Sequence, residues 1–411
     1  MESPGSTTEL HTVRFLRREG LEALTQKFGL LSSCHGAHPN LVLFKYDQVD
    51  SPFDAVEVQE CRGLIVDKDD DWRPVAMPFL KFFNYGESNG ADVDWSKPVR
   101  VMDKVDGSLS TLYYYKGDWH VSSSGRPDGG GSDPNRKLFR DLFWQTWKAM
   151  NYTLPDEEHQ HYCFMFELFS AENRIIVSPQ EELLLLTGAR NMQTLQEEDP
   201  AIFAERYGWR MPQLFEFKSL VEVTEAAKGI NPHFREGFVV CDHRFNRLKI
   251  KSPLYVALAH LTRKDKSALN KRRMLDIVRH NEGGEFLTYF PQWTSLYNQV
   301  KERFDELCNQ AESAWEELKG IGNERDFANA CRTRNVVADY LFARKKDRVG
   351  SARAFYGGMP EKKLEQILPR WKALVDTTPS LTPLVVEAQT DDEEASTATT
   401  ELPDEEERNA V

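Results

Sequence analysis

The sequence predicts an α+β fold with mainly antiparallel sheets, followed by an all-α domain and a disordered acidic tail. Short β-type runs separated by Gly, Pro, Asn and Asp turns dominate from about residue 41 to 255. After Pro253 apolar residues recur at spacings of three and four, the pattern of amphipathic helices. The last 25 residues hold ten acidic residues and one arginine. We therefore expect domains at 1–255 and 256–376 and a tail at 377–411.

Period-two patterns and turn residues set the expected elements in chain order. Strands are expected at Leu41–Phe44, Gly63–Val66, Val99–Met102, Thr111–Tyr115, Tyr162–Phe169, Leu183–Thr187, Gly237–Cys241 and Leu248–Ile250, with helices near Arg136–Asn151 and Pro200–Tyr207. Helices of the second domain are expected at Leu254–Leu261, Ser267–His280, Trp293–Gly320, Glu324–Lys346 and Lys362–Val375.

Composition excludes several classes of protein. The net charge is −13, but the acidic tail carries most of it, so a phosphate-binding function stays open. The six cysteines lie far apart without a Cys-x-x-Cys pair, which argues against zinc and disulfides and fits a reducing, intracellular compartment. No apolar run approaches membrane-spanning length, and residues 1–9 lack signal-peptide character, so no membrane association is expected.

The most informative segment is Lys104-Val105-Asp106-Gly107-Ser108. It places a lysine beside a tight Asp-Gly turn ahead of an apolar run, and Gly107 lets the backbone turn sharply next to a ligand. A lysine held in this way could attack a phosphate. The same residues also occur in ordinary hairpin turns, so the pentapeptide needs supporting residues elsewhere.

Other charged groups stand at strand starts or inside apolar strands. They are Arg62, Lys81, Glu167, Glu236, Lys249 and Lys251. Lys249 and Lys251 alternate with apolar residues and so share one face of a strand. Each also has a purely structural interpretation: Glu167 could pair with Arg174, and the two lysines could form a solvated strand face.

The order and local sequence of these groups resemble the phage-type RNA ligase 1 family, ATP-dependent RNA ligases of the covalent nucleotidyltransferase superfamily. The matching segments are Tyr46, Glu60-Cys61-Arg62-Gly63, Lys81-Phe82-Phe83-Asn84, Lys104-Val105-Asp106-Gly107-Ser108, Phe166-Glu167 with Asn173-Arg174-Ile175, Glu236-Gly237-Phe238-Val239, and Lys249-Ile250-Lys251-Ser252-Pro253-Leu254-Tyr255-Val256. The resemblance runs from about residue 40 to 370 and includes the helical second domain.

The resemblance implies an antiparallel-sheet nucleotidyltransferase domain, an ATP-grasp-like ligase fold. It implies that Lys104 attacks the α-phosphorus of ATP, that AMP passes to an RNA 5′-phosphate, and that a 3′-hydroxyl then seals the strand, with a broken tRNA as one candidate substrate. The implied ATP-binding residues are Tyr46, Arg62, Lys81, Phe83, Lys104, Gly107, Glu167, Lys249 and Lys251. The implied ligands for Mg²⁺ are Glu236, Glu167 and, in the second domain, Glu285 or its neighbour Glu282.

The surrounding cations have a physical role in this chemistry. Arg62, Lys81, Lys249 and Lys251 disfavour an ammonium on Lys104, and they balance phosphate charge as pyrophosphate leaves. One departure concerns the strand after Lys104, where Ser124 stands at a usually basic position and Arg126 follows in a shifted register.

Basic clusters on the expected helices could contact RNA phosphates, although such clusters are usually solvated faces. They comprise Arg263, Lys264, Lys266, Lys271, Arg272, Arg273, Arg344, Lys345, Lys346 and Arg348.

Two alternatives stay open. An RNA-capping guanylyltransferase is disfavoured, because those enzymes normally append a small barrel where this chain is helical. A catalytically weak RNA-end-binding protein on the same fold is left open by Ser124. A kinase-phosphatase acting upstream on the RNA ends is a further expected partner.

Overall fold

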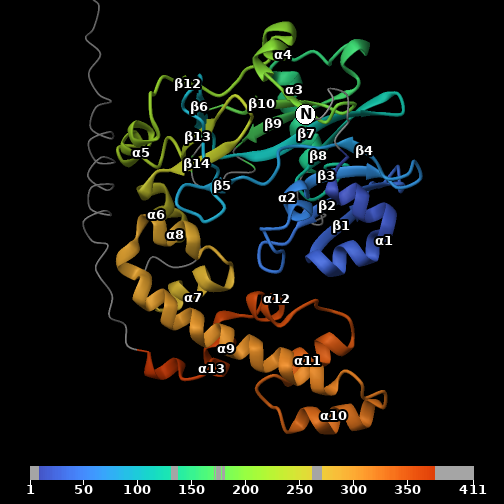
Figure 1. The fold of residues 1–411 in the computed structure, drawn as a ribbon, viewed down its shortest axis with the longest axis vertical. Coiled ribbons are helices and arrows are strands. Elements are labelled where there is room, and N and C mark those ends of the chain that lie inside the picture. Colours follow the sequence, from blue (N-terminus) through green and yellow to red (C-terminus); the bar gives the residue numbers. More distant parts are fainter. Residues whose placement is uncertain are drawn as a thin grey trace, which may run out of the picture.

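The computed structural model describes residues 9–130, 138–170, 172, 177, 181–261 and 271–374. Strands within these ranges form three sheets, and helices after residue 253 gather at one end of the molecule (Figure 1). The acidic tail, Arg174 and the basic residues Arg263, Lys264 and Lys266 lie outside the described residues. No described helix is both long enough and apolar enough to cross a membrane.

The first sheet has four antiparallel strands in the order β1-β2-β3-β4. They are β1 (Leu30–Cys34), β2 (Leu41–Tyr46), β3 (Arg62–Asp67) and β4 (Arg73–Ala76), with α1 (His11–Phe28) and α2 (Val56–Glu60) alongside. The carboxylate of Glu60 caps α1, accepting hydrogen bonds from the amides of His11 (3.0 Å) and Thr12 (2.8 Å). The sequence did not predict α1 or β1. The cap connects α1 to the end of α2, which directly precedes β3.

The second sheet has the order β11-β10-β9-β7-β8 and carries the aromatic core of the first domain. Its strands are β7 (Ser108–Tyr115), β8 (Asp118–Ser123), β9 (Tyr162–Phe169), β10 (Leu183–Asn191) and β11 (Glu197–Glu198). Helices α3 (Phe139–Ala149) and α4 (Pro200–Tyr207) cover it. Trp147, Phe166 and Trp209 pack edge to face, with ring centroids 5.2 to 5.6 Å apart.

The third sheet has the order β12-β6-β13-β14-β5. Its strands are β5 (Phe83–Asn84), β6 (Arg100–Lys104), β12 (Leu214–Phe215), β13 (Gly237–Cys241) and β14 (Arg247–Lys251), and α5 (Leu220–Lys228) packs on it. Only the β14–β5 pair is parallel among the described pairings. β6 therefore belongs to this sheet, whereas β7, which follows it directly, belongs to the second.

The helical part has its own core around the long helix α9 (Thr294–Leu318). The other helices are α6 (Pro253–Leu261), α7 (Lys271–Arg279), α8 (Gly283–Tyr289), α10 (Glu324–Arg332), α11 (Ala338–Lys345), α12 (Ala352–Gly357) and α13 (Glu361–Ile367). α8 lies against the strands of the third sheet (Figure 1). A Cβ on Gly86, just after β5, would lie 2.5 Å from the Thr288 side chain, so the two parts are in close contact.

The fold class agrees with the prediction, and the differences are local. The helix expected over Glu324–Lys346 is two helices, α10 and α11, separated by a turn after Arg332. The helix expected over Lys362–Val375 ends at Ile367 and is followed by a short 3₁₀ turn at Trp371–Ala373. In both cases apolar residues keep a helical spacing across a turn, because the turn also buries them in the same core.

Candidate active site

Lys104 lies at the end of β6, where the chain passes from the third sheet into the second. Gly107 allows this passage, because a Cβ there would lie 2.5 Å from the carbonyl oxygen of Leu168 on β9. The buried carboxylate of Asp106 accepts hydrogen bonds from the Tyr255 hydroxyl (2.7 Å) and from a backbone amide (2.8 Å). The segment is therefore an anchored crossing between sheets, and the hairpin alternative does not apply.

Four charged side chains of alternating sign run from Lys104 into the helical part. Lys104 Nζ lies 2.6 Å from Glu236, Lys251 Nζ lies 3.3 Å from the other oxygen of Glu236, and Lys251 Nζ also lies 2.7 Å from Glu285 on α8. The strand register explains the first two contacts. Gly237 pairs with Lys104 on one side and with Lys251 on the other, so the preceding glutamate stands between both lysines.

Glu236 is buried and gives Lys104 a partner that the sequence argument did not include. That argument considered only the cations near the lysine. A carboxylate oxygen at 2.6 Å is within hydrogen-bonding distance of the amine and is placed to receive its proton. The amine must leave this ion pair before it can act as a nucleophile.

The two lysines on β14 have opposite electrostatic environments. Burial, together with Arg62, Lys104 and Lys81, lowers the pKa of Lys249 well below its ordinary value. Burial also acts to lower the pKa of Lys251, but Glu285 and Glu236 outweigh it, and the pKa of Lys251 is raised. Lys251 is therefore a firmly charged cation.

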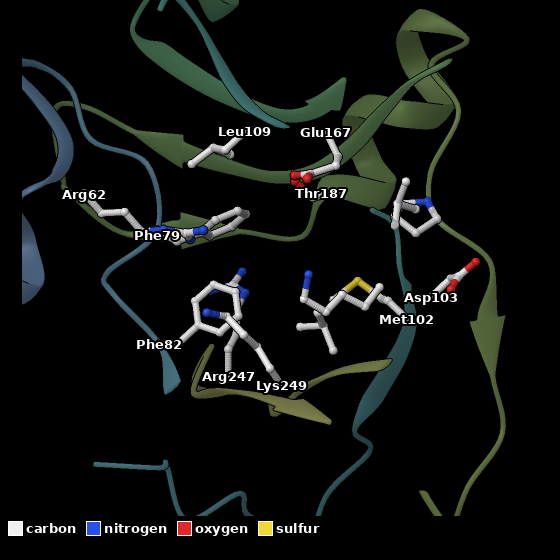
Figure 2. Close-up of a pocket in the computed structure, with 14 residues that line it drawn as sticks. Arg62, Phe79, Phe82, Met102, Asp103, Leu109, Glu167, Thr187, Arg247 and Lys249 are labelled. Atoms are coloured by element: carbon white, nitrogen blue, oxygen red, sulfur yellow. The ribbon is translucent and has the colours of Figure 1, made fainter. Parts of the chain in front are cut away.

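A cavity opens beside Lys104 between the second and third sheets. Figure 2 shows Leu109 and Glu167 on one side of it and Phe82, Arg247 and Lys249 on the other. The lining is mixed: the guanidinium of Arg62 lies 5.0 Å from the ring centre of Phe82, and the amine of Lys249 lies 4.7 Å from the same ring. Aromatic faces and several cations in one enclosed space suit a ligand with a flat ring and phosphates.

Glu167 is the carboxylate of this cavity. Its burial raises its pKa to about 7, against the lowering effect of Lys104 and Arg62. The side chain is therefore partly protonated near neutral pH and can donate as well as accept a hydrogen bond.

Not every predicted ATP-binding residue lines this cavity. Lys81 instead lies over three aromatic rings, those of Tyr46 (4.5 Å), Phe53 (4.2 Å) and Phe83 (5.1 Å). Phe83 is buried there, and its neighbour Phe82 takes the position in the cavity that was expected of an aromatic from this segment. Lys81 still acts on the site electrostatically, since it contributes to the lowered pKa of Lys249.

Some lining residues were missed by sequence reasoning. They include Phe79, Met102, Leu109, Thr187, Val239 and Arg247. Arg247 is buried, pairs with Glu197 at 2.6 Å and lies over the ring of Phe79 at 4.3 Å. Met102 and Thr187 stood at the ends of expected strands and Val239 stood inside a segment that resembles the family, but none of the three was predicted to contact a ligand.

Ser124 lies beside Gly63, the residue after Arg62. A Cβ on the next residue, Gly125, would lie 3.8 Å from the side chain of Lys45. A cation from the neighbouring β2 thus approaches the position where a basic residue was expected.

The described basic residues of the helical part are largely bound within it. Lys271 donates to the carbonyl of Leu374, Arg272 pairs with Glu365 at 2.7 Å, and Arg273 lies 3.4 Å from Asp276. Lys345 and Arg344 likewise donate to backbone carbonyls. These contacts favour a structural role for the clusters.

Glu236 is the carboxylate next to Lys104, and its two oxygens are paired with Lys104 and Lys251. Carboxylate oxygens suit a hard divalent cation that takes its other ligands from phosphate and water, so Glu236 fits such an ion once a lysine leaves it. Within the described ranges, the group of three metal-capable side chains that lie close together is Asp156, Glu158 and His159. Arg206 already binds both of those carboxylates, at 2.6 and 2.8 Å.

Comparison with known proteins finds a family and relatives that are described as RNA ligases. Residues 60–255 match a family described as RNA ligase, a range that includes every predicted site residue except Tyr46 and Glu285. An RNA ligase of Rhodothermus phage RM378 is 26% identical over 360 residues, covering 71% of this chain and 79% of the phage protein.

A second relative is longer than this chain. A putative bifunctional polynucleotide kinase/RNA ligase of Autographa californica nuclear polyhedrosis virus is 27% identical over 325 residues, which cover 74% of this chain and 45% of the viral protein.

Likeness to solved structures is distant. An archaeal ATP-dependent RNA ligase has a TM-score of 0.43 at 12% identity, covering 94% of this chain and 99% of its own. A Naegleria gruberi RNA ligase mutant with ATP and manganese has a TM-score of 0.31 at 12% identity, covering 39% of this chain and 51% of its own.

Proposed function

Since the chain belongs to the phage-type RNA ligase 1 family, we propose that it uses ATP to join RNA 5′-phosphate and 3′-hydroxyl ends through AMP carried on Lys104. The observation that carries this proposal is the position of Lys104. Its amine stands at a cavity with Arg62 and Lys249, in contact with the carboxylate of Glu236.

In the first step the amine of Lys104 leaves its ion pair with Glu236 and gives up its protons to solvent, and Nζ attacks the α-phosphorus of ATP. The bond between phosphorus and nitrogen forms while the bond to pyrophosphate breaks. The guanidinium of Arg62, which lines the cavity, stabilises the developing negative charge, and Lys251, whose pKa is raised by Glu285 and Glu236, adds positive charge on the far side of Glu236. Lys249, whose pKa is lowered, gains a proton more readily once phosphate charge is nearby.

The cavity favours adenosine in a defined orientation. Phe82 and Val239 supply apolar surface for the base, and Glu167 is placed for the ribose hydroxyls. Glu236 is the carboxylate that would hold a divalent cation, which we propose is magnesium and which would neutralise phosphate charge.

The RNA steps rest on the family. AMP passes from Lys104 to the 5′-phosphate, and the 3′-hydroxyl then displaces AMP and closes the strand. We propose an intracellular role in the repair of broken RNA, tRNA included, downstream of a kinase-phosphatase that prepares the ends. The baculovirus relative, which carries both kinase and ligase in its name, supports this order of reactions.

Incubation with α-labelled ATP or GTP and Mg²⁺, followed by denaturation, tests the proposal. We expect acid-labile label from ATP that is lost in Lys104→Ala and retained in Lys228→Ala, a matched change at an exposed lysine on α5. Label from GTP would indicate a capping enzyme. Absence of label from both nucleotides would favour an RNA-end-binding protein.

A further inference from the structure

A second cavity reaches Lys104 from another side. It has a volume of about 300 Å³, within the range of sites that hold small ligands. Asp103, Lys104 and Val105 line both cavities, and Glu236 lines the second. A ligand in the second cavity would therefore reach the same amine as a nucleotide in the first.

The second cavity combines apolar and charged side chains that suit a nucleotide. Leu183, Leu185 and Met211 line it together with the cations Arg210 and Arg235 and the carboxylates Asp103, Asp106 and Glu236. Phe234 lines it with 73% of its surface exposed. An exposed phenylalanine beside arginines is an arrangement by which proteins bind single-stranded nucleotides, by stacking and by phosphate contacts.

The two arginines have different partners. Arg210 pairs with Glu181 at 3.1 Å, and both side chains are more than half exposed, so this pair contributes little to stability and a phosphate can replace Glu181. Arg235 lies 3.1 Å from Asp103 in a less exposed pair and stacks over the ring of Phe215 at 4.6 Å. A guanidinium carries five N–H donors, so Arg235 can contact a phosphate while it keeps Asp103.

We propose that the second cavity binds the terminal nucleotide of the 5′-phosphorylated RNA strand, with Arg210 and Arg235 on its phosphates and Phe234 stacked on its base. This inference rests on the proposed function, because it requires AMP on Lys104. The bound 5′-phosphate attacks the adenylyl phosphorus, and the phosphorus–nitrogen bond to Lys104 breaks. Nζ leaves with the electron pair, takes a proton from solvent and returns to Glu236.

An RNA site in the second cavity explains why Lys104 lines two cavities. ATP must enter and pyrophosphate must leave before RNA approaches, whereas the adenosine stays bound between these steps. Separate cavities that share only the reacting amine and its neighbours allow that order. The polar neighbour common to both, Asp103, is itself paired with Arg235, so an RNA phosphate on that arginine also changes the charge next to Lys104.

The test separates the steps of the reaction in the full chain. Phe234→Ala and Arg210→Gln are assayed for label transfer from ATP to the protein, and then for AMP transfer to a 5′-phosphorylated, 3′-blocked single-stranded RNA. We expect a change of less than about twofold in labelling of the protein and a loss of about tenfold or more in transfer to RNA, seen as a higher KM for RNA.

Matched controls are Ile202→Ala and Arg206→Gln, an exposed apolar residue and an exposed arginine on α4. They should alter neither step. A second measurement compares binding of 5′-phosphate and 5′-hydroxyl RNA oligonucleotides by fluorescence anisotropy. Wild type should prefer the phosphate end, and Arg210→Gln with Arg235→Lys should lose that preference.

The possible results are distinct. Loss of protein labelling in Phe234→Ala would assign the cavity to ATP, and unchanged transfer to RNA in both variants would remove it from the reaction; either result overturns the inference. Wild-type protein that takes no label at all would overturn the proposed function, and the inference with it.

Discussion

Replacing Glu167 by glutamine should stabilise the protein at alkaline pH while it weakens activity. Burial raises the pKa of this carboxyl to about 7 from an ordinary value of 4.5. The folded protein therefore binds a proton at Glu167 more tightly than the unfolded chain does. Stability from this group is fully present below pH 4.5 and is lost as pH rises through 7, because ionisation then costs the folded state more than the unfolded state.

The size of the effect follows from those two values. Their difference, at about 1.36 kcal/mol per pH unit, corresponds to at most about 3 kcal/mol. Solvent in the cavity reduces this figure. Glutamine keeps the shape of the side chain and cannot ionise, so the variant should match the wild type near pH 4.5 and exceed it in stability above pH 8.

Urea unfolding followed by tryptophan fluorescence at several pH values measures this difference. Glu205→Gln, at an exposed position on α4, is the matched control and should leave the pH profile unchanged. The same Glu167→Gln protein should show weakened labelling by ATP, since the ribose partner is altered. A variant whose stability follows the wild-type profile at every pH would refute the electrostatic account of Glu167.

The remaining predictions concern the turn, the helical part and the metal. Gly107→Ala should destabilise the protein by about 2 kcal/mol and abolish labelling, because the new methyl group would lie 2.5 Å from a carbonyl oxygen of β9; Gly320→Ala, with open space around it, is the control, and equal unfolding midpoints for the two would contradict the argument. Glu285→Gln removes one of the two carboxylates that pair with Lys251, so the rate of labelling at neutral pH should fall, and an unchanged rate would show that this ion pair does not act in the labelling step. Chelation with EDTA should stop labelling and added Mg²⁺ should restore it, whereas Glu236→Gln should require more Mg²⁺ for half-maximal rate; full labelling in EDTA would exclude a metal role for Glu236.

Sequence reasoning succeeded where local pattern and local chemistry agree. The strand holding Lys249 and Lys251 alternates apolar and basic residues, and both lysines do share a face, because side chains alternate along any strand. The sequence singled out Gly107 as a sharp turn beside a ligand, and in the structure the glycine is needed for another reason, because a Cβ there would lie 2.5 Å from the Leu168 carbonyl oxygen. The change from strands to helices after Pro253 was also predicted from the sequence.

Sequence reasoning left positions open where a residue depends on a distant partner. The Lys81 segment suggested Phe83 or a neighbouring aromatic as an adenine contact; Phe83 is buried beneath Lys81, and its neighbour Phe82 lines the cavity. Adjacent residues on an extended chain point in opposite directions, and only packing against the rest of the protein decides which one faces inward.

By itself, the sequence determined the fold class and the resemblance to RNA ligases, and it predicted a set of site residues, because these depend on periodicity and on ordered motifs. Tertiary structure alone decided which of them meet. Glu236 stands between Lys104 and Lys251 because β13 lies between β6 and β14, and Glu285 joins them because α8 docks on that sheet. Contacts of this kind arise from strand order and domain packing, which bring together residues more than 130 positions apart in the chain.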